Sequence, residues 1–147
     1  MNAPSKCDYS SLFLENQICF PLYACSKEII KRYRPFLEEL GLTYTQYLVM
    51  LVLWEKQSLS AKELGQLLYL DSGTLTPVLK RLEEKRLLSR RRSDDDERNL
   101  LVSLSEEGEE LKRRAVKVPQ GLAACVKLEE SEARELYRLL YKFLGAL

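Results

Sequence analysis

The fold is decided by residues 60–85, which read SAKELGQLLYLDSGTLTPVLKRLEEK. Ser60 and Glu63 form an S-x-x-E capping box, and this pattern predicts a short helix that runs through Leu67. After a brief connection, apolar residues three and four apart predict a second helix, with Ser72 as its N-cap. Two short helices joined by a tight turn form a helix-turn-helix unit.

The second predicted helix has an apolar face and a polar face. Its apolar face carries Leu75, Val78, Leu79 and Leu82. In helix-turn-helix proteins the N-terminal end of this helix enters the major groove of DNA. Hydroxyl groups there can contact base edges, and basic side chains can neutralise phosphates. Helix capping is the commoner role for a serine such as Ser72, and it is compatible with a DNA contact. The candidate DNA contacts are Ser72, Thr74, Thr76, Lys80 and Arg81.

A β-hairpin is predicted directly after this helix. Residues 87–92 and 99–104 have strand-like patterns, and the polar turn SDDDER separates them. A hairpin in this position is a wing, and an arginine at its tip can enter the negative potential of a narrow minor groove. A charge run is usually a solvated surface, but its place beside a recognition helix favours DNA. The candidate wing contacts are Arg90 and Arg98, with Asp96 able to orient a guanidinium by bidentate pairing.

Helices are predicted on the N-terminal side of this unit. Residues 11–40 have helical spacing, and we expect a start, a kink or a break near Pro21 and Pro35. Gly41 supplies a stop signal. Residues 44–54 are apolar on nearly every side, so this helix belongs in the centre of the core.

Two further helices are predicted on the C-terminal side. Ser105 is expected to cap a helix that runs to about residue 127 and bends near Pro119 and Gly121. A last helix begins at Ser131. The fold class is therefore mainly α with a small β-hairpin wing, in a single domain that spans residues 1–147.

Composition excludes several kinds of site. The 147 residues include 23 basic and 22 acidic side chains, so the net charge of +1 neither supports nor excludes a nucleic-acid partner. The absence of histidine removes histidine-based acid–base catalysis and most zinc geometries, and we expect no metal or cofactor. The sequence shows neither an apolar run of ~18 residues nor a secretory signal, so we expect a cytoplasmic protein without a membrane partner.

Residues 68–108 resemble the winged helix-turn-helix segment of MarR-family regulators, and the likeness extends over essentially the whole chain. The triplet Asp96-Glu97-Arg98 is similar to the wing-tip signature of that family. The resemblance implies a homodimer that binds palindromic operators in double-stranded DNA and usually represses. It assigns the DNA-binding part to about residues 43–104 and the dimerisation helices to about residues 11–40 and 105–147.

The N-terminal segment LENQICFPLYACSKEIIKRY, residues 14–33, resembles the organic-hydroperoxide-sensing OhrR branch of this family. In that branch a cysteine matching Cys19 reacts with the peroxide, and some members use a second cysteine that Cys125 resembles in position. Pro21 departs from the pattern of the branch, which has an ordinary helix former there. The tyrosines that surround the reactive cysteine match Tyr23, Tyr33 and Tyr44.

Oxidation of a cysteine by peroxide requires a thiolate, whereas an ordinary thiol with a pKa of ~8.5 is mostly protonated in the cell. Cys19 and Tyr23 are four residues apart and are neighbours if both are helical. Tyr33 lies roughly 21 Å further along a straight helix, so the resemblance requires that it and Tyr44 reach the sulfur from the partner subunit. Pro21 favours the first turn of a helix and would leave Cys19 near a positive dipole end.

We therefore expect a repressor in which organic hydroperoxide oxidises Cys19, which then forms a disulfide with Cys125 of the partner subunit, so that the dimer releases its operator. Three alternatives remain open. The first is a MarR-type repressor released by a small aromatic ligand, with buried structural cysteines and ordinary interface tyrosines. The others are a thiol peroxidase and a winged-helix module for protein contact. Cys7 and Cys25 are assigned no role, and we expect no enzymatic activity.

Overall fold

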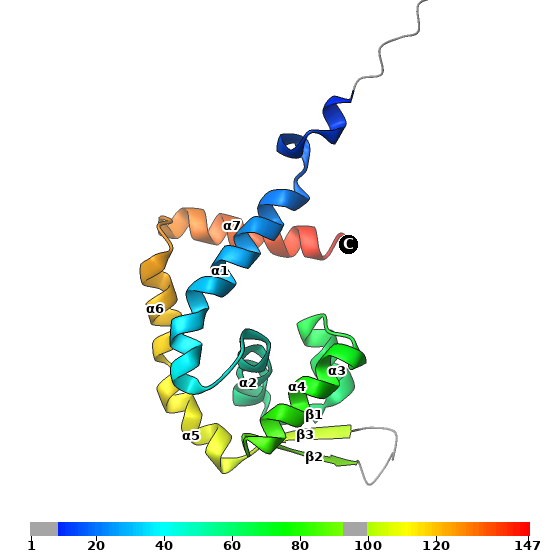
Figure 1. Cartoon of the computed structure of the whole chain (residues 1–147), viewed down its shortest axis with the longest axis vertical. Coiled ribbons are helices and arrows are strands. Elements are labelled where there is room, and N and C mark those ends of the chain that lie inside the picture. Colours follow the sequence, from blue (N-terminus) through cyan, green and yellow to red (C-terminus); the bar gives the residue numbers. More distant parts are fainter. Residues whose placement is uncertain (1–8, 93–99) are drawn as a thin grey trace, which may run out of the picture.

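Helices dominate the structure, and a small antiparallel sheet lies at one end of it (Figure 1). The computed structural model describes residues 9–92 and 100–147. The helices are α1 (Cys19–Leu40), α2 (Tyr44–Lys56), α3 (Ala61–Leu68), α4 (Ser72–Glu84), α5 (Glu106–Ala115), α6 (Lys117–Cys125) and α7 (Glu130–Leu144), preceded by the 3₁₀ turns η1 (Ser10–Leu12) and η2 (Leu14–Asn16). The strands are β1 (Ser58–Ser60), β2 (Leu88–Arg92) and β3 (Leu100–Leu104). The predicted mainly α fold with a hairpin after a helix-turn-helix pair is confirmed.

The sheet has the order β1-β3-β2, and both pairings are antiparallel. β3 is the central strand, and its Val102 lies opposite Leu59 on one side and Arg90 on the other. The side chain of Val102 is fully buried beneath the helices. β1 was not predicted from the sequence, because three residues are too few to show a strand period.

Side-chain caps begin the helices around the wing. Thr43, Ser60 and Ser105 each accept a hydrogen bond from a first-turn backbone N–H, as predicted. The prediction for α4 is wrong by one residue, because Asp71 is the N-cap and Ser72 is the first helical residue. Asp71 accepts the backbone N–H of Thr74 at 2.7 Å. A carboxylate in this place also suits the positive end of the helix dipole.

The core forms around α2, as its dense apolar sequence predicts. Its buried apolar residues are Tyr47, Val49, Met50, Leu53 and Trp54. They pack against the apolar face of α4, whose Leu75, Leu79 and Leu82 are buried. The indole nitrogen of Trp54 donates to the carbonyl oxygen of Gly108 at 2.8 Å, so α2 is tied to the start of α5.

Helix α1 is one unbroken helix from Cys19 to Leu40. Pro21 occupies its third position, where a missing N–H costs nothing, and a helix start near Pro21 was predicted. No break occurs at Pro35, although an interior proline removes a hydrogen bond. In this part of the fold α1 packs against both α2 and α6. Gly41 ends the helix with φ at 67°, a left-handed conformation that favours glycine.

The predicted helix after Ser105 divides into α5 and α6 at Val116. Pro119 then lies at the third position of α6, the same position that Pro21 has in α1. Gly121 lies against α1 rather than at a bend, because a Cβ on it would come within 2.3 Å of the Phe36 ring. Figure 1 shows that α6 runs alongside α1 in the opposite direction.

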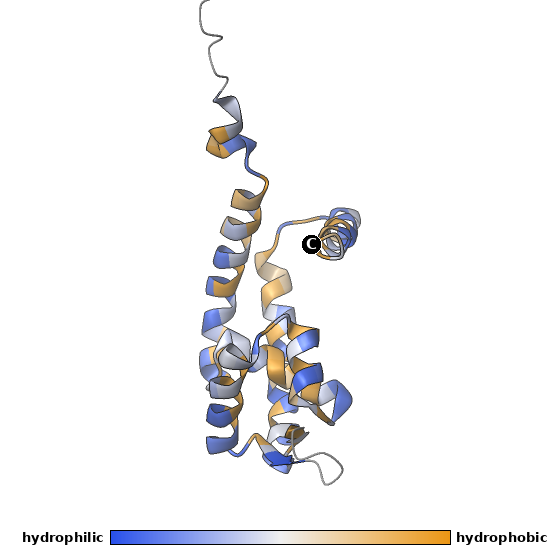
Figure 2. Cartoon of the chain, turned by 90° about the vertical axis from the view of Figure 1, so that its right-hand side faces the viewer, coloured by the Kyte–Doolittle hydropathy of each residue, from blue (hydrophilic) through white to orange (hydrophobic). Residues whose placement is uncertain are grey.

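Helix α7 and the start of α1 are not packed into the core. No residue of α7 is buried, and in α1 only Leu37 is. Figures 1 and 2 show α7 lying apart from the helix-turn-helix body. Large apolar side chains are exposed on both segments, among them Ile18, Phe20, Leu136, Leu139 and Phe143. Within residues 9–92 and 100–147, no helix is long and apolar enough to cross a membrane.

We predict that Gly108→Ala destabilises the fold, because a Cβ there would lie 2.2 Å from the carbonyl oxygen of Leu87 and 2.7 Å from Cδ1 of Leu104. The expected loss in the free energy of unfolding is about 1–3 kcal/mol, measured by urea denaturation. Gly145→Ala is the control, since its nearest neighbour would be 3.4 Å away. Equal midpoints for the two variants would contradict the close packing of α5 on the base of the wing.

Candidate DNA-binding surface and cysteine site

The exposed face of α4 carries the predicted DNA contacts. Ser72, Thr74, Thr76, Lys80 and Arg81 are all exposed, while Leu75, Leu79 and Leu82 point into the core. The helix begins at a cap exposed to solvent, so its N-terminal end is free to approach a groove. The arrangement therefore presents hydroxyl groups first and cations one or two turns later.

Asp71 fixes one of the three hydroxyls. The Thr74 hydroxyl donates to Oδ2 of Asp71 at 3.2 Å, in addition to the backbone bond that caps the helix. These hydrogen bonds hold the pKa of Asp71 below its usual value, so the carboxylate is ionised at neutral pH. Its stabilising effect is present above the ordinary pKa of 3.8 and is lost as the pH falls through the lowered folded-state pKa. Among the described residues of α4, the hydroxyl groups of Ser72 and Thr76 form no side-chain hydrogen bond with Asp71.

The cations of this face are free to meet phosphates. Lys80 and Arg81 are exposed and form no ion pair with any carboxylate in the described part of the chain. Arg91 and Arg92 are exposed on β2, where the wing leaves the body. Neither Arg91 nor Arg92 was singled out from the sequence, because a run of three arginines does not show which side chain points to solvent.

Arg90 is held by Glu83 of α4. Its Nε and Nη2 atoms donate to Oε2 of Glu83 at 2.9 and 2.7 Å, and its backbone N–H donates to Oε1 at 3.0 Å. The Arg90 guanidinium, a predicted DNA contact, is therefore committed to a carboxylate. Glu83 was missed in the sequence, since it lies seven residues before Arg90 across a turn and resembles any other charge on a helix surface. The predicted wing-tip residues Asp96 and Arg98 lie outside the described residues, as does Cys7.

The three described cysteines are free and exposed. Cys19 is the first residue of α1, Cys25 lies almost two turns further along the same helix, and Cys125 is the last residue of α6. Cys19 and Tyr23 share one face of α1, and Tyr23 is also exposed. Cys19 thus lies at the positive end of a helix dipole, as its proximity to Pro21 predicts.

Cys19 and Cys125 are far apart within one chain. The contact between Phe36 and Gly121 provides a common reference level for the two antiparallel helices. At 1.5 Å per residue, Cys19 lies about 25 Å above this level and Cys125 about 6 Å above it. A disulfide requires Cα atoms within about 7 Å of each other, so the described fold keeps the two thiols of one chain from bonding.

The predicted tyrosines divide into two groups. Tyr33 and Tyr44 are half-buried where α1 meets α2, with ring centroids 4.9 Å apart, and Tyr33 also lies 5.9 Å from the ring of Tyr47. Burial raises the pKa of both Tyr33 and Tyr44, so their hydroxyls keep their protons and remain hydrogen-bond donors. Tyr23 stands apart on the exposed half of α1, with the ammonium group of Lys27 5.9 Å from its ring centroid.

Comparison with known proteins agrees with this architecture. The family model described as transcriptional regulator SarA/Rot matches residues 27–115, more than half of the chain. The organic hydroperoxide resistance transcriptional regulator of Bacillus subtilis is 47% identical over 139 residues, which are 95% of each chain. The regulator SarZ of Staphylococcus aureus is 41% identical over 133 residues, or 90% of each chain.

Solved structures of AbfR of Staphylococcus epidermidis have the same fold. Overoxidized AbfR bound to DNA matches with a TM-score of 0.75 at 34% identity, over 90% of this chain and 93% of that one. Reduced AbfR bound to DNA matches with a TM-score of 0.74, and disulfide-formed AbfR with 0.61. The chain therefore belongs to the MarR-type family of winged helix-turn-helix transcriptional regulators, alongside the Bacillus organic hydroperoxide resistance regulator.

Proposed function

We propose that this chain is a homodimeric transcriptional repressor that organic hydroperoxides inactivate by oxidation of Cys19. The observation that carries the proposal is the placement of its thiols. Cys19 is the first residue of α1, at its exposed end, and Cys125 is the last residue of α6, which packs against α1. Along the helix axes, Cys19 and Cys125 of one chain lie about 20 Å apart. A second subunit can bring a Cys19 to a Cys125 that its own chain does not reach.

The dimer would form through α7 and the first half of α1, whose large apolar side chains are exposed in the part of the chain that the structure describes. Figure 2 displays apolar residues along the outer part of α1 and on α7, and Leu136, Leu139 and Phe143 are exposed there. Apolar patches of this kind mark protein interfaces, because leaving them in water is unfavourable. A twofold dimer places two α4 helices for two half-sites about 34 Å apart, which suits a palindromic operator. Such a regulator acts where the chromosome is, in the cytoplasm.

DNA binding would use α4 and the wing. Ser72, Thr74 and Thr76 are the candidates for base and phosphate contacts in the major groove, and Lys80 and Arg81 for phosphates. Arg98, oriented by Asp96, is the candidate for the minor groove. The exposure of the α4 face, with its unpaired cations, supports these assignments.

The tyrosines would prepare Cys19 for oxidation. Tyr23, on the same face of α1, and the partner subunit's Tyr33 and the partner subunit's Tyr44 would donate hydrogen bonds to the thiolate. Hydrogen bonds to the charged form of a thiol favour that form. Tyr33 and Tyr44 can serve as donors because their pKa values, which burial raises, leave both phenols protonated at neutral pH, as an ordinary phenol would also be.

Oxidation of Cys19 would proceed in two steps. The Cys19 thiolate attacks the distal oxygen of an organic hydroperoxide, the O–O bond breaks, and the alkoxide leaves as the alcohol after it takes a proton. Cys19 is now a sulfenic acid. The thiolate of Cys125 of the partner subunit attacks the Cys19 sulfur, an S–S bond forms, and hydroxide leaves as water after protonation. One hydroperoxide has been reduced to alcohol and water, and two thiols have been oxidised to one disulfide.

Disulfide formation, rather than oxidation of one thiol, would cause operator release. AbfR has been solved bound to DNA in both the reduced and the overoxidized state. The chain described here is less similar to disulfide-formed AbfR, with a TM-score of 0.61, than to the DNA-bound forms, with 0.74 and 0.75. This difference supports a change of shape on bridging, which would alter the separation of the two α4 helices.

The cysteine prediction is tested with a short palindromic operator from DNA upstream of the protein's own gene. Wild type and Cys25→Ser should release it after a slight excess of organic hydroperoxide, whereas Cys19→Ser should stay bound, because it has lost the oxidisable thiol. Cys125→Ser should release it less completely or only at higher peroxide. Affinity is measured by fluorescence anisotropy, and a reductant should restore it. Retention of the operator by oxidised wild type would refute the sensor and favour release by a small aromatic ligand.

The DNA surface is tested by salt dependence. Lys80→Ala should weaken operator binding and lower the slope of log K against log[salt] by about 1, because one phosphate contact is lost. Lys117→Ala is the matched control and should leave the slope unchanged, because Lys117 is an exposed cation of α6 that forms no ion pair among the described residues. An unchanged slope for Lys80→Ala would remove α4 from the DNA interface.

A further inference from the structure

The geometry points to Glu83 as a positioning residue for DNA binding, which holds the wing at a fixed angle to the recognition helix α4 through Arg90. This inference rests on the proposed DNA-binding function and deepens it. It reassigns Arg90, a predicted DNA contact, to a role inside the protein. Its chemistry is unusual for a DNA-facing surface, because the acting group is an anion.

One carboxylate makes three hydrogen bonds across the junction. Oε2 of Glu83 accepts Nε and Nη2 of Arg90 at 2.9 and 2.7 Å, and Oε1 accepts the Arg90 backbone N–H at 3.0 Å. Two of the three bonds join opposite charges, and such bonds are shorter and stronger than neutral ones. Arg90 is the less exposed partner, with 22% of its side chain accessible against 37% for Glu83. The contact therefore fixes both the strand backbone and its side chain.

The hydrogen bonds from Arg90 to Glu83 add to the attachments that already hold the base of the wing. At the base of the wing, the backbone N–H of Leu87 donates to the Leu82 carbonyl at 3.0 Å, and the Ser105 hydroxyl donates to the Arg86 carbonyl at 2.6 Å. These bonds and the pairing of β3 with β1 hold the base of the wing. β2 is the edge strand of the sheet, and among the described residues its ladder partner is β3 alone. Glu83 holds β2 at its third residue, directly before Arg91 and Arg92, which are exposed. The wing cations then keep a fixed distance from those of α4.

Electrostatics alone would disfavour Glu83 in this place. The hydrogen bonds and the charge of Arg90 hold the pKa of Glu83 below its usual value, so it is an anion at neutral pH. An anion beside the DNA-binding face repels phosphates, and its removal should strengthen binding if charge were its only effect. A positioning role predicts the opposite sign. The direction of the change in affinity therefore separates the two interpretations.

The experiment compares wild type, Glu83→Gln and Glu84→Gln on a short palindromic duplex that the wild-type protein selects from a random pool. Glu84→Gln removes the same charge from the adjacent residue of α4, and Glu84 forms no ion pair among the described residues. We expect Glu83→Gln to bind about tenfold more weakly and Glu84→Gln to bind equally or more tightly. The slope of log K against log[salt] should fall for Glu83→Gln only, because the wing loses phosphate contacts.

A double variant shows whether the two residues act as a pair. Arg90→Gln alone should weaken binding as Glu83→Gln does, and Glu83→Gln/Arg90→Gln should cost no more than either single change. Thermal denaturation confirms that each variant is folded at the assay temperature, and the salt slope reports only on folded protein. Unchanged or tighter binding by Glu83→Gln would overturn the inference, as would additive losses in the double variant. If the wild type selects no duplex, the proposed function fails instead.

Discussion

The antiparallel packing of α1 against α6 determines where Cys19 and Cys125 lie relative to each other. Gly121 allows the Phe36 ring to approach α6 closely, and this contact sets the level of one helix against the other. Because α1 then continues unbroken to Cys19, that thiol is carried about 20 Å beyond Cys125 of the same chain. Because Cys19 and Cys125 cannot form a disulfide within one chain, a disulfide between them would have to join two subunits. Within residues 9–92 and 100–147, the same extension leaves the side chains of the first half of α1 largely exposed.

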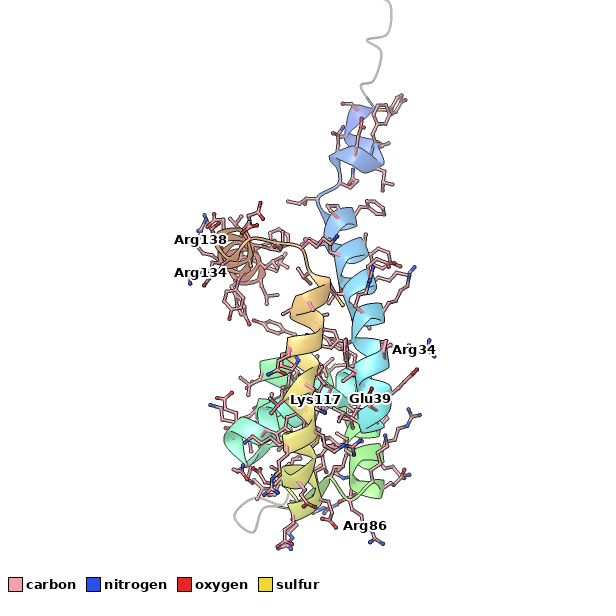
Figure 3. All side chains as sticks on the ribbon, turned by 90° about the vertical axis from the view of Figure 1, so that its left-hand side faces the viewer. Arg34, Glu39, Arg86, Lys117, Arg134 and Arg138 are labelled. Carbon is pink, nitrogen blue, oxygen red and sulfur yellow. The ribbon has the colours of Figure 1, made fainter. Side chains whose placement is uncertain are left out.

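The proposed redox site and the proposed DNA-binding surface share one framework. The helices α5 and α6 form a nearly continuous segment beside α1 (Figure 3). This segment runs from the base of the wing to Cys125. At its lower end, Trp54 donates to Gly108, and Lys112 donates to the Trp54 carbonyl at 2.9 Å, so the core helix α2 is fixed to α5. Near the junction of α5 with α6, Arg114 of α5 donates to the Glu39 carbonyl of α1 at 2.5 Å. A force on Cys125 would therefore act on a segment bonded to the DNA-binding body.

The sequence predicted most of the fold, because local signals decide it. The capping box at Ser60 and the dense apolar run of α2 reproduce the observed elements closely. The misses have physical causes. Asp71 replaces Ser72 as a cap, since both residue types are good caps and only geometry selects one. Pairing across the chain, such as β1 with β3 or Glu83 with Arg90, leaves no period in the sequence. The sequence also could not predict that Cys19 and Cys125 are exposed.

We propose that the oxidised bridge joins two subunits. The most direct measurement is non-denaturing oxidation with an organic hydroperoxide, followed by non-reducing electrophoresis and mass mapping of linked peptides. We expect a covalent dimer in which the Cys19 peptide is joined to the Cys125 peptide. We also expect Cys19→Ser and Cys125→Ser chains to become covalently linked when they are mixed as heterodimers, whereas neither variant does so alone. A Cys19–Cys125 bridge within a single monomer, or oxidised Cys19 with no bridge at all, would contradict the proposal.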